Sequence, residues 1–299
     1  MKKIFLYNRK TKKIEEEIIT GKLLIKLIYN NKIGLKLTEK ILKKPKFSFW
    51  YGNLLKTKRS KNKINSFIKQ HSLDINEIED RLDSFKSFND FFIRKLKKTS
   101  REIDHDKTAF ISPADSRLIV YKIEKNTIIP VKGINFKLEQ IINNKKIAEK
   151  YEDGLCFVFR LAPADYHRFC YIDDGIHGKI KSLGSYYHSV HPIALQSNSE
   201  VFQHNYREFC EIQTKNFDEI LWLDVGALGV SKIIQNKPLG GEIKKGEEKG
   251  YFEFGGSTII IVTKKNIIKL DDDIKDYSFA GIETKIKYGE KIGTMDYPQ

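Results

Sequence analysis

The chain has 299 residues, of which 40% are hydrophobic and 31% are charged, and its formal net charge is +15. These values are typical of an ordinary soluble globular protein with one large domain or two smaller ones. No run reaches the roughly 18 apolar residues of a bilayer span, and no signal-peptide pattern opens the chain. We therefore expect an intracellular protein, or one that lies on a membrane surface.

The positive charge is concentrated at the N-terminal end. Residues 1–70 contain 20 Lys and Arg against 4 Glu and no Asp, whereas residues 71–299 contain 34 basic and 35 acidic residues. Such an asymmetry indicates a polyanionic partner, either nucleic acid or an anionic membrane. The alternative is a Lys-rich proteome that places these side chains on a solvated helix face.

The three cysteines, Cys156, Cys170 and Cys210, are odd in number and have no paired spacing. This pattern favours a reducing compartment over a disulfide framework or a zinc site. No metal is expected.

An amphipathic helix is predicted over 21–44, because Leu24, Leu27 and Ile28 recur at helical spacing among lysines. An aromatic cluster follows directly, formed by Phe47, Phe49, Trp50 and Tyr51. A basic amphipathic helix beside aromatic residues is typical of an interfacial membrane anchor. A helix packed on the body of the protein is the alternative, and base stacking on nucleic acid is less favoured because no nucleic-acid module surrounds these residues.

Helices are predicted to continue over 64–98, with Ser72 and Asp74 as capping residues. From about residue 109 the chain consists of short β-rich runs separated by turns, with one clear helix predicted at 135–151. We therefore predict an α+β protein: a helical, basic region over 1–100, followed by a β-rich body over 101–299 that is a sandwich or barrel-like.

Three polar clusters in the body are candidates for chemistry. Asp115 lies in "SPADSR", where an aspartate usually serves turn geometry. His167 follows a predicted strand within "ADYHR" and is a better candidate for proton transfer than most histidines. His188 and His191 are three residues apart, but no further ligand follows at a useful spacing for a metal.

The fourth cluster interrupts a strand at "GYFEFGGSTIIIV", where Gly255 and Gly256 precede Ser257. Because Gly256 has no Cβ, the Ser257 hydroxyl can approach the preceding carbonyl with little obstruction. The pattern is not a GxSxG nucleophile elbow, so internal attack on the 256–257 peptide bond is favoured over a hydrolase nucleophile.

Seven stretches, taken in order along the chain, resemble the phosphatidylserine decarboxylases of the bacterial, pyruvoyl-dependent type. They are "FNDFFIRKLKKTSREID" (88–104), "ISPADSRL" (111–118), "VKGINFKLEQII" (131–142), "LAPADYHRFCYIDDG" (161–175), "FQHNYRE" (202–208), "VGALGVSKI" (225–233) and "KKGEEKGYFEFGGST" (244–258).

The resemblance implies that the chain is a zymogen that cleaves itself. Ser257 attacks the carbonyl of Gly256, and elimination followed by hydrolysis converts the serine to a pyruvoyl group with loss of ammonia. The products are a β chain of residues 1–256 and an α chain of residues 257–299. By motif position, His167 is the base and Asp115 the acid that orients it.

The resemblance also implies the substrate and the cofactor. The covalent pyruvoyl group at position 257 forms a Schiff base with phosphatidylserine, carbon dioxide leaves, and His167 returns a proton to give phosphatidylethanolamine. A peripheral membrane protein at the cytoplasmic face of the cell membrane is implied, as a heterodimer of α and β chains, with a higher oligomer left open and no nucleic-acid partner. Residues 21–44 and the aromatic cluster then become the docking element, and deletion of residues 1–60 is expected to weaken membrane binding without affecting self-cleavage.

Two positions depart from the family pattern. Cys170 stands where many members have a second histidine, so His167 is assigned to both stages, with His188 or His191 as substitutes. Ser116 stands where glycine is usual. The alternatives that remain are a pyruvoyl-dependent decarboxylase of a soluble amino acid, a serine hydrolase and a non-catalytic basic membrane- or RNA-binding protein.

Overall fold

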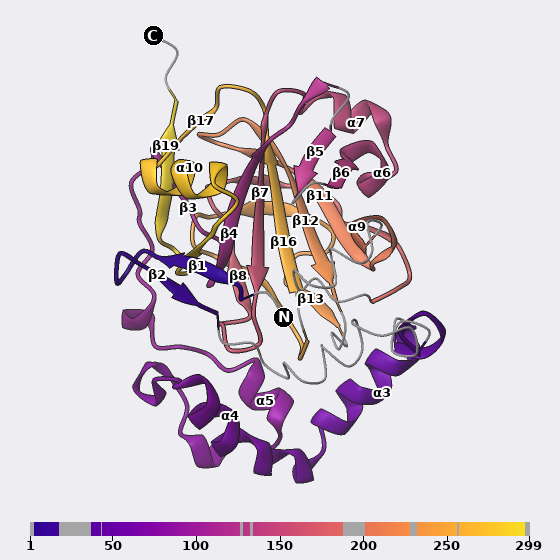
Figure 1. Cartoon of the computed structure of the whole chain (residues 1–299), viewed down its shortest axis with the longest axis vertical. Coiled ribbons are helices and arrows are strands. Elements are labelled where there is room, and N and C mark those ends of the chain that lie inside the picture. The colour runs from indigo at the N-terminus through magenta and orange to yellow at the C-terminus, as the bar shows by residue number, and fades with distance from the viewer. Residues whose placement is uncertain are drawn as a thin grey trace.

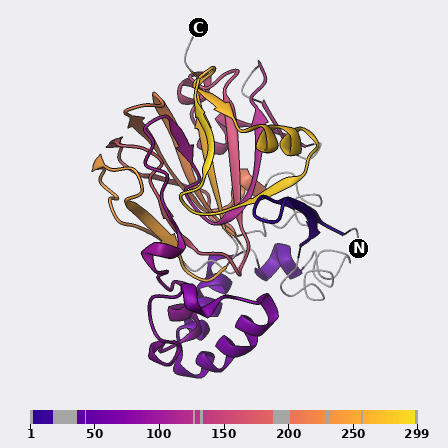
Figure 2. The same cartoon turned by 90° about the vertical axis from the view of Figure 1, so that its left-hand side faces the viewer.

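The computed structural model describes residues 3–17, 37–42, 44–125, 128–131, 134–187, 201–227, 232–255 and 257–296. Within these ranges a large sheet stands above a layer of helices formed by the N-terminal third of the chain (Figures 1 and 2). None of the helices in these ranges has the length and hydropathy that a bilayer span requires. Most of the predicted basic helix over 21–44 lies outside the described residues.

The large sheet has eleven strands among the described residues, and all the neighbouring pairs except β1–β18 are antiparallel. Its order is β14 (Gly241–Ile243), β9 (Gly175–His177), β11 (Arg207–Thr214), β12 (Glu219–Gly226), β16 (Ser257–Thr263), β7 (Leu155–Leu161), β4 (Ser116–Lys122), β18 (Glu283–Ile286), β1 (Phe5–Asn8) and β2 (Lys13–Glu16), with β10 (Lys181–Leu183) beside β11.

Strand β16 lies at the centre of this sheet and is buried on both faces. Ile259 and Ile261 join one hydrophobic cluster, and Ile260 and Val262 join a second cluster on the opposite face. Because successive side chains of a strand point to opposite faces, a strand covered on both sides needs apolar residues at every position. This requirement explains the saturated run that follows Ser257.

Different elements cover the two faces. The first cluster includes residues of two three-stranded sheets, β13 (Ile233–Gln235), β15 (Glu248–Phe252) and β8 (Arg168–Cys170), and β17 (Ile268–Leu270), β19 (Lys291–Met295) and β3 (Ala109–Ile111). The second face carries the hairpin β5 (Ile128–Val131) and β6 (Ile134–Lys137) with α6 (Leu138–Ile142) and α7 (Lys145–Glu149). The body is therefore a sheet-on-sheet sandwich on one side and is covered by a hairpin and helices on the other.

The remaining helices are short. Those of the N-terminal layer are η1 (Thr38–Leu42), α3 (Pro45–Leu55), η2 (Lys58–Asn62), α4 (Lys63–His71), η3 (Ile75–Glu77), η4 (Leu82–Ser84), α5 (Phe88–Phe92) and η5 (Lys98–Ser100), and the body adds α9 (Val201–His204) and α10 (Asp272–Phe279). The N-terminal layer has a core of its own, centred on Phe67, Phe88 and Phe91. The predicted α+β fold, with a helical N-terminal region and a β-rich body, is confirmed.

Two helix predictions are wrong in detail. The helix predicted over 135–151 begins as strand β6 and then breaks between α6 and α7, where Asn143 has φ 50° and the Asn144 side chain caps Ile147. Asparagine tolerates the left-handed conformation and also caps helices, so two adjacent asparagines stop one helix and start another. Between Asp74 and Ser87 only two three-residue turns are helical, η3 and η4, because the chain turns back to bury Ile78 and Phe85 in the N-terminal core.

Residues 5–16 also differ from the mainly helical expectation for the first hundred residues. They form the hairpin β1–β2, and β1 pairs in parallel with β18 from the C-terminal end of the chain. The N-terminus thereby closes one edge of the sheet (Figure 1).

Candidate active site

Ser257 is the first residue of β16 and lies between two neighbouring strands. Its backbone pairs with Leu161 of β7 and with Gly226 of β12, and its side chain has no exposed surface. A residue held on both sides in the middle of a sheet has a fixed side-chain direction. The hydroxyl of Ser257 is thus positioned by the sheet itself.

His167 faces this hydroxyl. The Nδ1 atom of His167 lies 3.3 Å from the Ser257 Oγ, and its Nε2 atom lies 3.0 Å from the carbonyl oxygen of Ala162. A carbonyl oxygen can only accept a hydrogen bond, so Nε2 carries the proton and Nδ1 presents its lone pair to the serine hydroxyl. The two residues that the sequence placed 90 positions apart therefore form a serine–base pair.

Burial keeps the His167 ring neutral. The side chain is fully buried against Phe92, with the ring centroids 4.1 Å apart, and burial lowers its pKa to about 3. Desolvation disfavours the charged form of a histidine. At neutral pH the ring is consequently available as a base.

The Ala162 carbonyl is held in place by a second layer of contacts. Asp165 accepts a hydrogen bond of 2.7 Å from the Ala162 backbone amide and forms a buried ion pair with Arg117. Arg117 in turn binds Glu17, which follows strand β2. These contacts connect the N-terminal hairpin to the loop that orients His167.

Among the described residues, Asp115 forms a hydrogen bond with neither Ser257 nor the His167 ring. Its two carboxylate oxygens accept hydrogen bonds of 2.7 and 2.6 Å from Arg101, and one also accepts the Tyr288 backbone amide at 2.8 Å. Burial alone would raise the pKa of Asp115, but the hydrogen bonds and charge of Arg101 hold it below its usual value. Both ring nitrogens of His167 are engaged elsewhere, so the orienting role expected of Asp115 remains a prediction.

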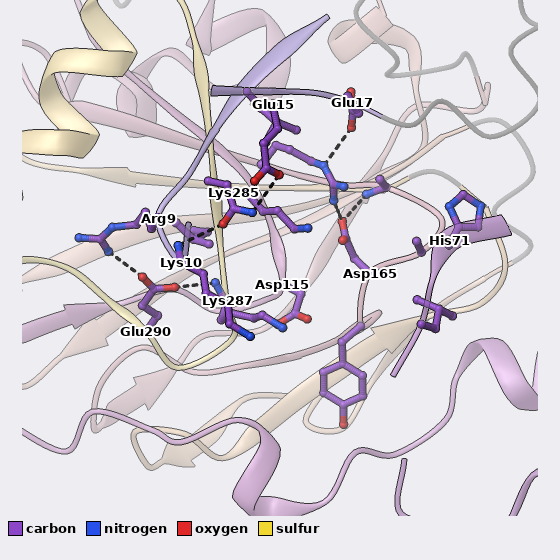
Figure 3. Close-up of a pocket in the computed structure, with 18 of the residues that line it drawn as sticks. Arg9, Lys10, Glu15, Glu17, His71, Asp115, Asp165, Lys285, Lys287 and Glu290 are labelled. Carbon is purple, nitrogen blue, oxygen red and sulfur yellow. Dashed lines mark hydrogen bonds and ion pairs between the residues drawn. The ribbon is translucent and has the colours of Figure 1, made fainter. Parts of the chain in front are cut away.

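Asp115 and Asp165 both line a cavity of about 830 Å³ between the hairpin β1–β2, the N-terminal helices and the body. Figure 3 shows the two carboxylates in this cavity, with Lys285 and Lys287 nearby and His71 toward one side. Most of the residues that line the cavity are charged or polar, and the cavity reaches the Ala162 loop, which binds His167.

The segment before Ser257 is held by the helical layer. The Phe254 ring packs against Phe92 and Phe88 of α5, with centroid distances of 4.9 and 5.4 Å, and its backbone amide donates to the Asn89 side chain at 3.1 Å. Lys56, just after α3, forms an ion pair of 2.8 Å with Glu253.

Gly255 follows these anchored residues with φ 144°, a backbone conformation that disfavours residues with a side chain. The N-terminal helices therefore fix the approach to position 257. Deletion of residues 1–60 would remove the Lys56–Glu253 ion pair and keep the contacts of α5, so its effect on self-cleavage remains a prediction.

Several predicted site residues fall elsewhere. Gly256, His188 and His191 lie outside the described residues. Cys170 is fully buried, and burial raises the pKa of its thiol to about 12, which keeps it protonated at neutral pH. Cys170 therefore has no ionised form with which to replace a histidine.

Sequence reasoning missed the groups that surround the pair. The Ala162 carbonyl has no sequence signal, because any residue supplies one. Asn89, Phe92 and Arg101 lie within the first family-like stretch, but nothing in their spacing indicates that they contact position 254, His167 and Asp115.

Fold and site together define an α+β enzyme with a buried serine–histidine pair at the start of a central strand. The sequence model of the family described as "Phosphatidylserine decarboxylase" matches residues 88–294. The chain is 44% identical over 292 residues to a protein of Clostridium botulinum, and the aligned region covers 97% of this chain and 99% of that protein. It is 44% identical over 291 residues to one of Clostridium tetani (97% and 98%) and 43% identical over 292 residues to one of Clostridium beijerinckii (97% and 99%).

Each of these three relatives is named "Phosphatidylserine decarboxylase proenzyme". The chain belongs to the phosphatidylserine decarboxylase family, and the resemblance found in the sequence is confirmed.

Proposed function

We propose that this chain cleaves itself between Gly256 and Ser257 and then decarboxylates phosphatidylserine to phosphatidylethanolamine. The observation that carries the proposal is the 3.3 Å contact between the Ser257 Oγ and the lone-pair nitrogen of a neutral His167. Family membership supports the substrate and the reaction type.

His167 begins the cleavage as the general base. Its Nδ1 takes the hydroxyl proton while the Ser257 Oγ bonds to the carbonyl carbon of Gly256, and the bond from that carbon to the Ser257 nitrogen breaks. The nitrogen takes up a proton, so the peptide becomes an ester. The Ala162 carbonyl stabilises the imidazolium that forms, because Nε2–H already donates to it at 3.0 Å.

The residues around position 257 fit a pyruvoyl group formed there after ester elimination. The position is buried, it begins a rigid strand and it faces a single neutral imidazole. A pyruvoyl group supplies an electrophilic carbonyl that accepts the electron pair released with carbon dioxide. His167 faces position 257, and we propose that it also returns the proton to the carbon of a substrate bound there.

The sheet explains how the two fragments remain together. After cleavage at 256/257, β16 of the α chain stays hydrogen-bonded between β7 and β12 of the β chain, and β18 stays between β4 and β1. Separation would break the central ladders and expose both hydrophobic clusters. We therefore propose a permanent α–β heterodimer.

Membrane docking is proposed for the outer face of α3. Phe49 and Trp50 are 48% and 58% exposed, Leu54 is 43% exposed, and Lys44 and Lys46 are adjacent. Exposed aromatic residues beside lysines favour an interface between headgroups and acyl chains, where each basic residue contributes on the order of 1 kcal/mol. This face supports a peripheral position on a membrane, and we propose that the membrane surface is the cytoplasmic one.

The test of the catalytic proposal is the intact mass of the purified chain, followed by an assay with phosphatidylserine. The wild-type chain is expected as two fragments, the smaller carrying pyruvate at its N-terminus, whereas Ser257→Ala is expected as one inactive chain. Thr258→Val is the matched control: the Thr258 hydroxyl lies next in β16, is buried and has no hydrogen-bond partner among the described residues, so its loss should leave cleavage intact. An active, uncleaved Ser257→Ala chain would refute the proposal.

A further inference from the structure

Arg94 is a buried arginine that lacks a close partner. Its side chain lies between α5 and the Ala162 loop, and the residue is only 6% exposed. Its hydrogen bonds are long: 3.5 Å to the carbonyl oxygens of Phe91 and Phe92 and 3.4 Å to that of Ala164. Its guanidinium also stacks on the Phe91 ring at 5.0 Å. Within the described residues, no carboxylate lies within ion-pair distance of it.

Other buried arginines of the chain are better satisfied. Arg160 binds Glu17 and Glu283 at 2.9 and 2.6 Å, and Arg117 binds Glu17 and Asp165. Arg207 has no carboxylate, but it donates to two carbonyl oxygens at 2.8 Å and to that of Ile141. A buried charge is costly unless it is paired or fully hydrogen-bonded. Arg94 therefore has unused donors for an anion.

The position of Arg94 connects it to the reaction centre. His167 binds the Ala162 carbonyl, and Arg94 binds the Ala164 carbonyl of the same loop. Phe92 and Phe91, adjacent in α5, contact His167 and Arg94 respectively. Arg94 also lines the cavity of Figure 3. An anion bound to Arg94 thus lies beside the base that acts on position 257.

We propose that Arg94 binds the phosphodiester group of the substrate. This inference rests on the proposed function and assigns a binding role at the same site. The amine and the phosphate of a phosphoserine headgroup are separated by only two carbons and one oxygen. A group anchored by its amine at position 257 therefore holds its phosphate close to the Ala162 loop, which binds both His167 and Arg94. The planar guanidinium matches a phosphodiester with two parallel hydrogen bonds.

The substrate carboxylate is the other anion, and the chemistry disfavours it. The carboxylate loses its negative charge as carbon dioxide leaves, so an arginine bound to it would stabilise the ground state more than the transition state. The phosphodiester keeps its charge throughout. An arginine bound to the phosphodiester therefore lowers the KM without raising the activation barrier of decarboxylation.

The test uses processed enzyme, with rates divided by the pyruvoyl content of each preparation. Arg94→Gln is expected to raise the KM for phosphatidylserine in detergent micelles by about 10- to 100-fold with kcat nearly unchanged. Arg94→Lys keeps the positive charge but not the planar guanidinium, and its KM should lie between those of the wild type and Arg94→Gln. Arg207→Lys controls for replacement of a buried guanidinium and should leave the KM at the wild-type value.

Two inhibitors separate the two anions. Glycerophosphoethanolamine has the phosphodiester and no carboxylate, and L-serine has the carboxylate and no phosphate. Arg94→Gln should weaken inhibition by glycerophosphoethanolamine by the same factor as the KM and leave inhibition by L-serine unchanged. If Arg94→Gln weakened inhibition by L-serine and not by glycerophosphoethanolamine, the proposal would be overturned and Arg94 would be assigned to the carboxylate. Unchanged inhibition by both compounds would also overturn the proposal.

A binding measurement distinguishes failure of this site from failure of the proposed function. Calorimetric titration of the wild-type and Arg94→Lys chains with glycerophosphoethanolamine requires no turnover, and Arg94→Lys should bind several-fold more weakly. Equal affinities would overturn the Arg94 site even in an active enzyme. A wild-type chain that binds the compound through Arg94 but releases no carbon dioxide would refute the function alone.

Discussion

At the scale of single residues, a backbone carbonyl holds the base. The Ala162 oxygen accepts the Nε2 proton of His167 and so leaves Nδ1 unprotonated toward Ser257. In a serine–histidine–aspartate triad a carboxylate performs this task. Here no carboxylate hydrogen-bonds to the His167 ring among the described residues. Asp165 acts on the ring indirectly, because it accepts the Ala162 amide hydrogen bond. Asp115 is bound to Arg101 instead.

The role of His167 can be tested through cleavage kinetics. His167→Gln should slow the appearance of fragments by about 100- to 10,000-fold, which is the usual contribution of a general base. His105→Gln, at an exposed histidine, is the control. Because burial lowers the pKa of His167 to about 3, the wild-type rate should be constant from about pH 5 to 8. A rate that rises through a pKa near 6.5 would contradict the buried, neutral state of the ring.

At the scale of elements, α5 positions the segment that precedes the cleavage site. Asn89→Leu removes the acceptor for the Phe254 amide, and Asn89→Asp retains one. Loss of one hydrogen bond, about 1 kcal/mol, should slow cleavage about fivefold in the leucine variant and much less in the aspartate variant. Gel densitometry gives the rate, and the thermal midpoint of each precursor separates this effect from general destabilisation. Equal rates in the two variants would remove Asn89 from any positioning role.

The α3 face gives a second prediction at this scale. The double substitution of Phe49 and Trp50 by serine should lower sedimentation with phosphatidylserine vesicles by at least tenfold, because two exposed aromatic side chains no longer enter the interface. Phe279→Ser is the matched control, since Phe279 is 95% exposed on α10. Point substitutions are preferable to deletion of residues 1–60, which would also remove Lys56 and Glu17. Unchanged sedimentation of the double variant would exclude this face as the docking surface.

At the scale of the whole molecule, two buried histidines connect stability to pH. Burial lowers the pKa of His167 to about 3 and that of His177 to about 4. In the unfolded chain both titrate near 6.5, so the unfolded state takes up protons first as the pH falls. The two neutral, buried histidines therefore contribute fully to the free energy of unfolding above about pH 6.5, and this contribution is lost progressively below that pH.

The free energy of unfolding of Ser257→Ala precursor should therefore fall between pH 6 and 5. Each of the two histidines contributes a slope of up to about 1.4 kcal/mol per pH unit. Urea titrations at each pH measure the fall, and His167→Gln in the same background should reduce it. A free energy that does not change with pH would contradict the buried state of both rings.

Much of this protein is determined by its sequence. The ordered family motifs predict Ser257, His167 and Asp115 as the chemical groups, and the run after Ser257 predicts a strand, because each is a local property of consecutive residues. The α+β division follows from the same local patterns. The prediction of one continuous helix over 135–151 is wrong, because Asn143 adopts the left-handed conformation and Asn144 caps a new helix, although the apolar spacing continues across both residues.

Only the tertiary structure decides which groups meet. The Ala162 carbonyl, the Asn89–Phe254 contact and the isolation of Arg94 depend on segments far apart in the chain. A backbone carbonyl is the same in every residue, and a buried charge is unpaired only relative to its surroundings. The sequence by itself therefore predicts a nucleophile and a base, whereas packing decides the tautomer of His167, the contacts of the segment before Ser257 and the absence of a close carboxylate beside Arg94 among the described residues.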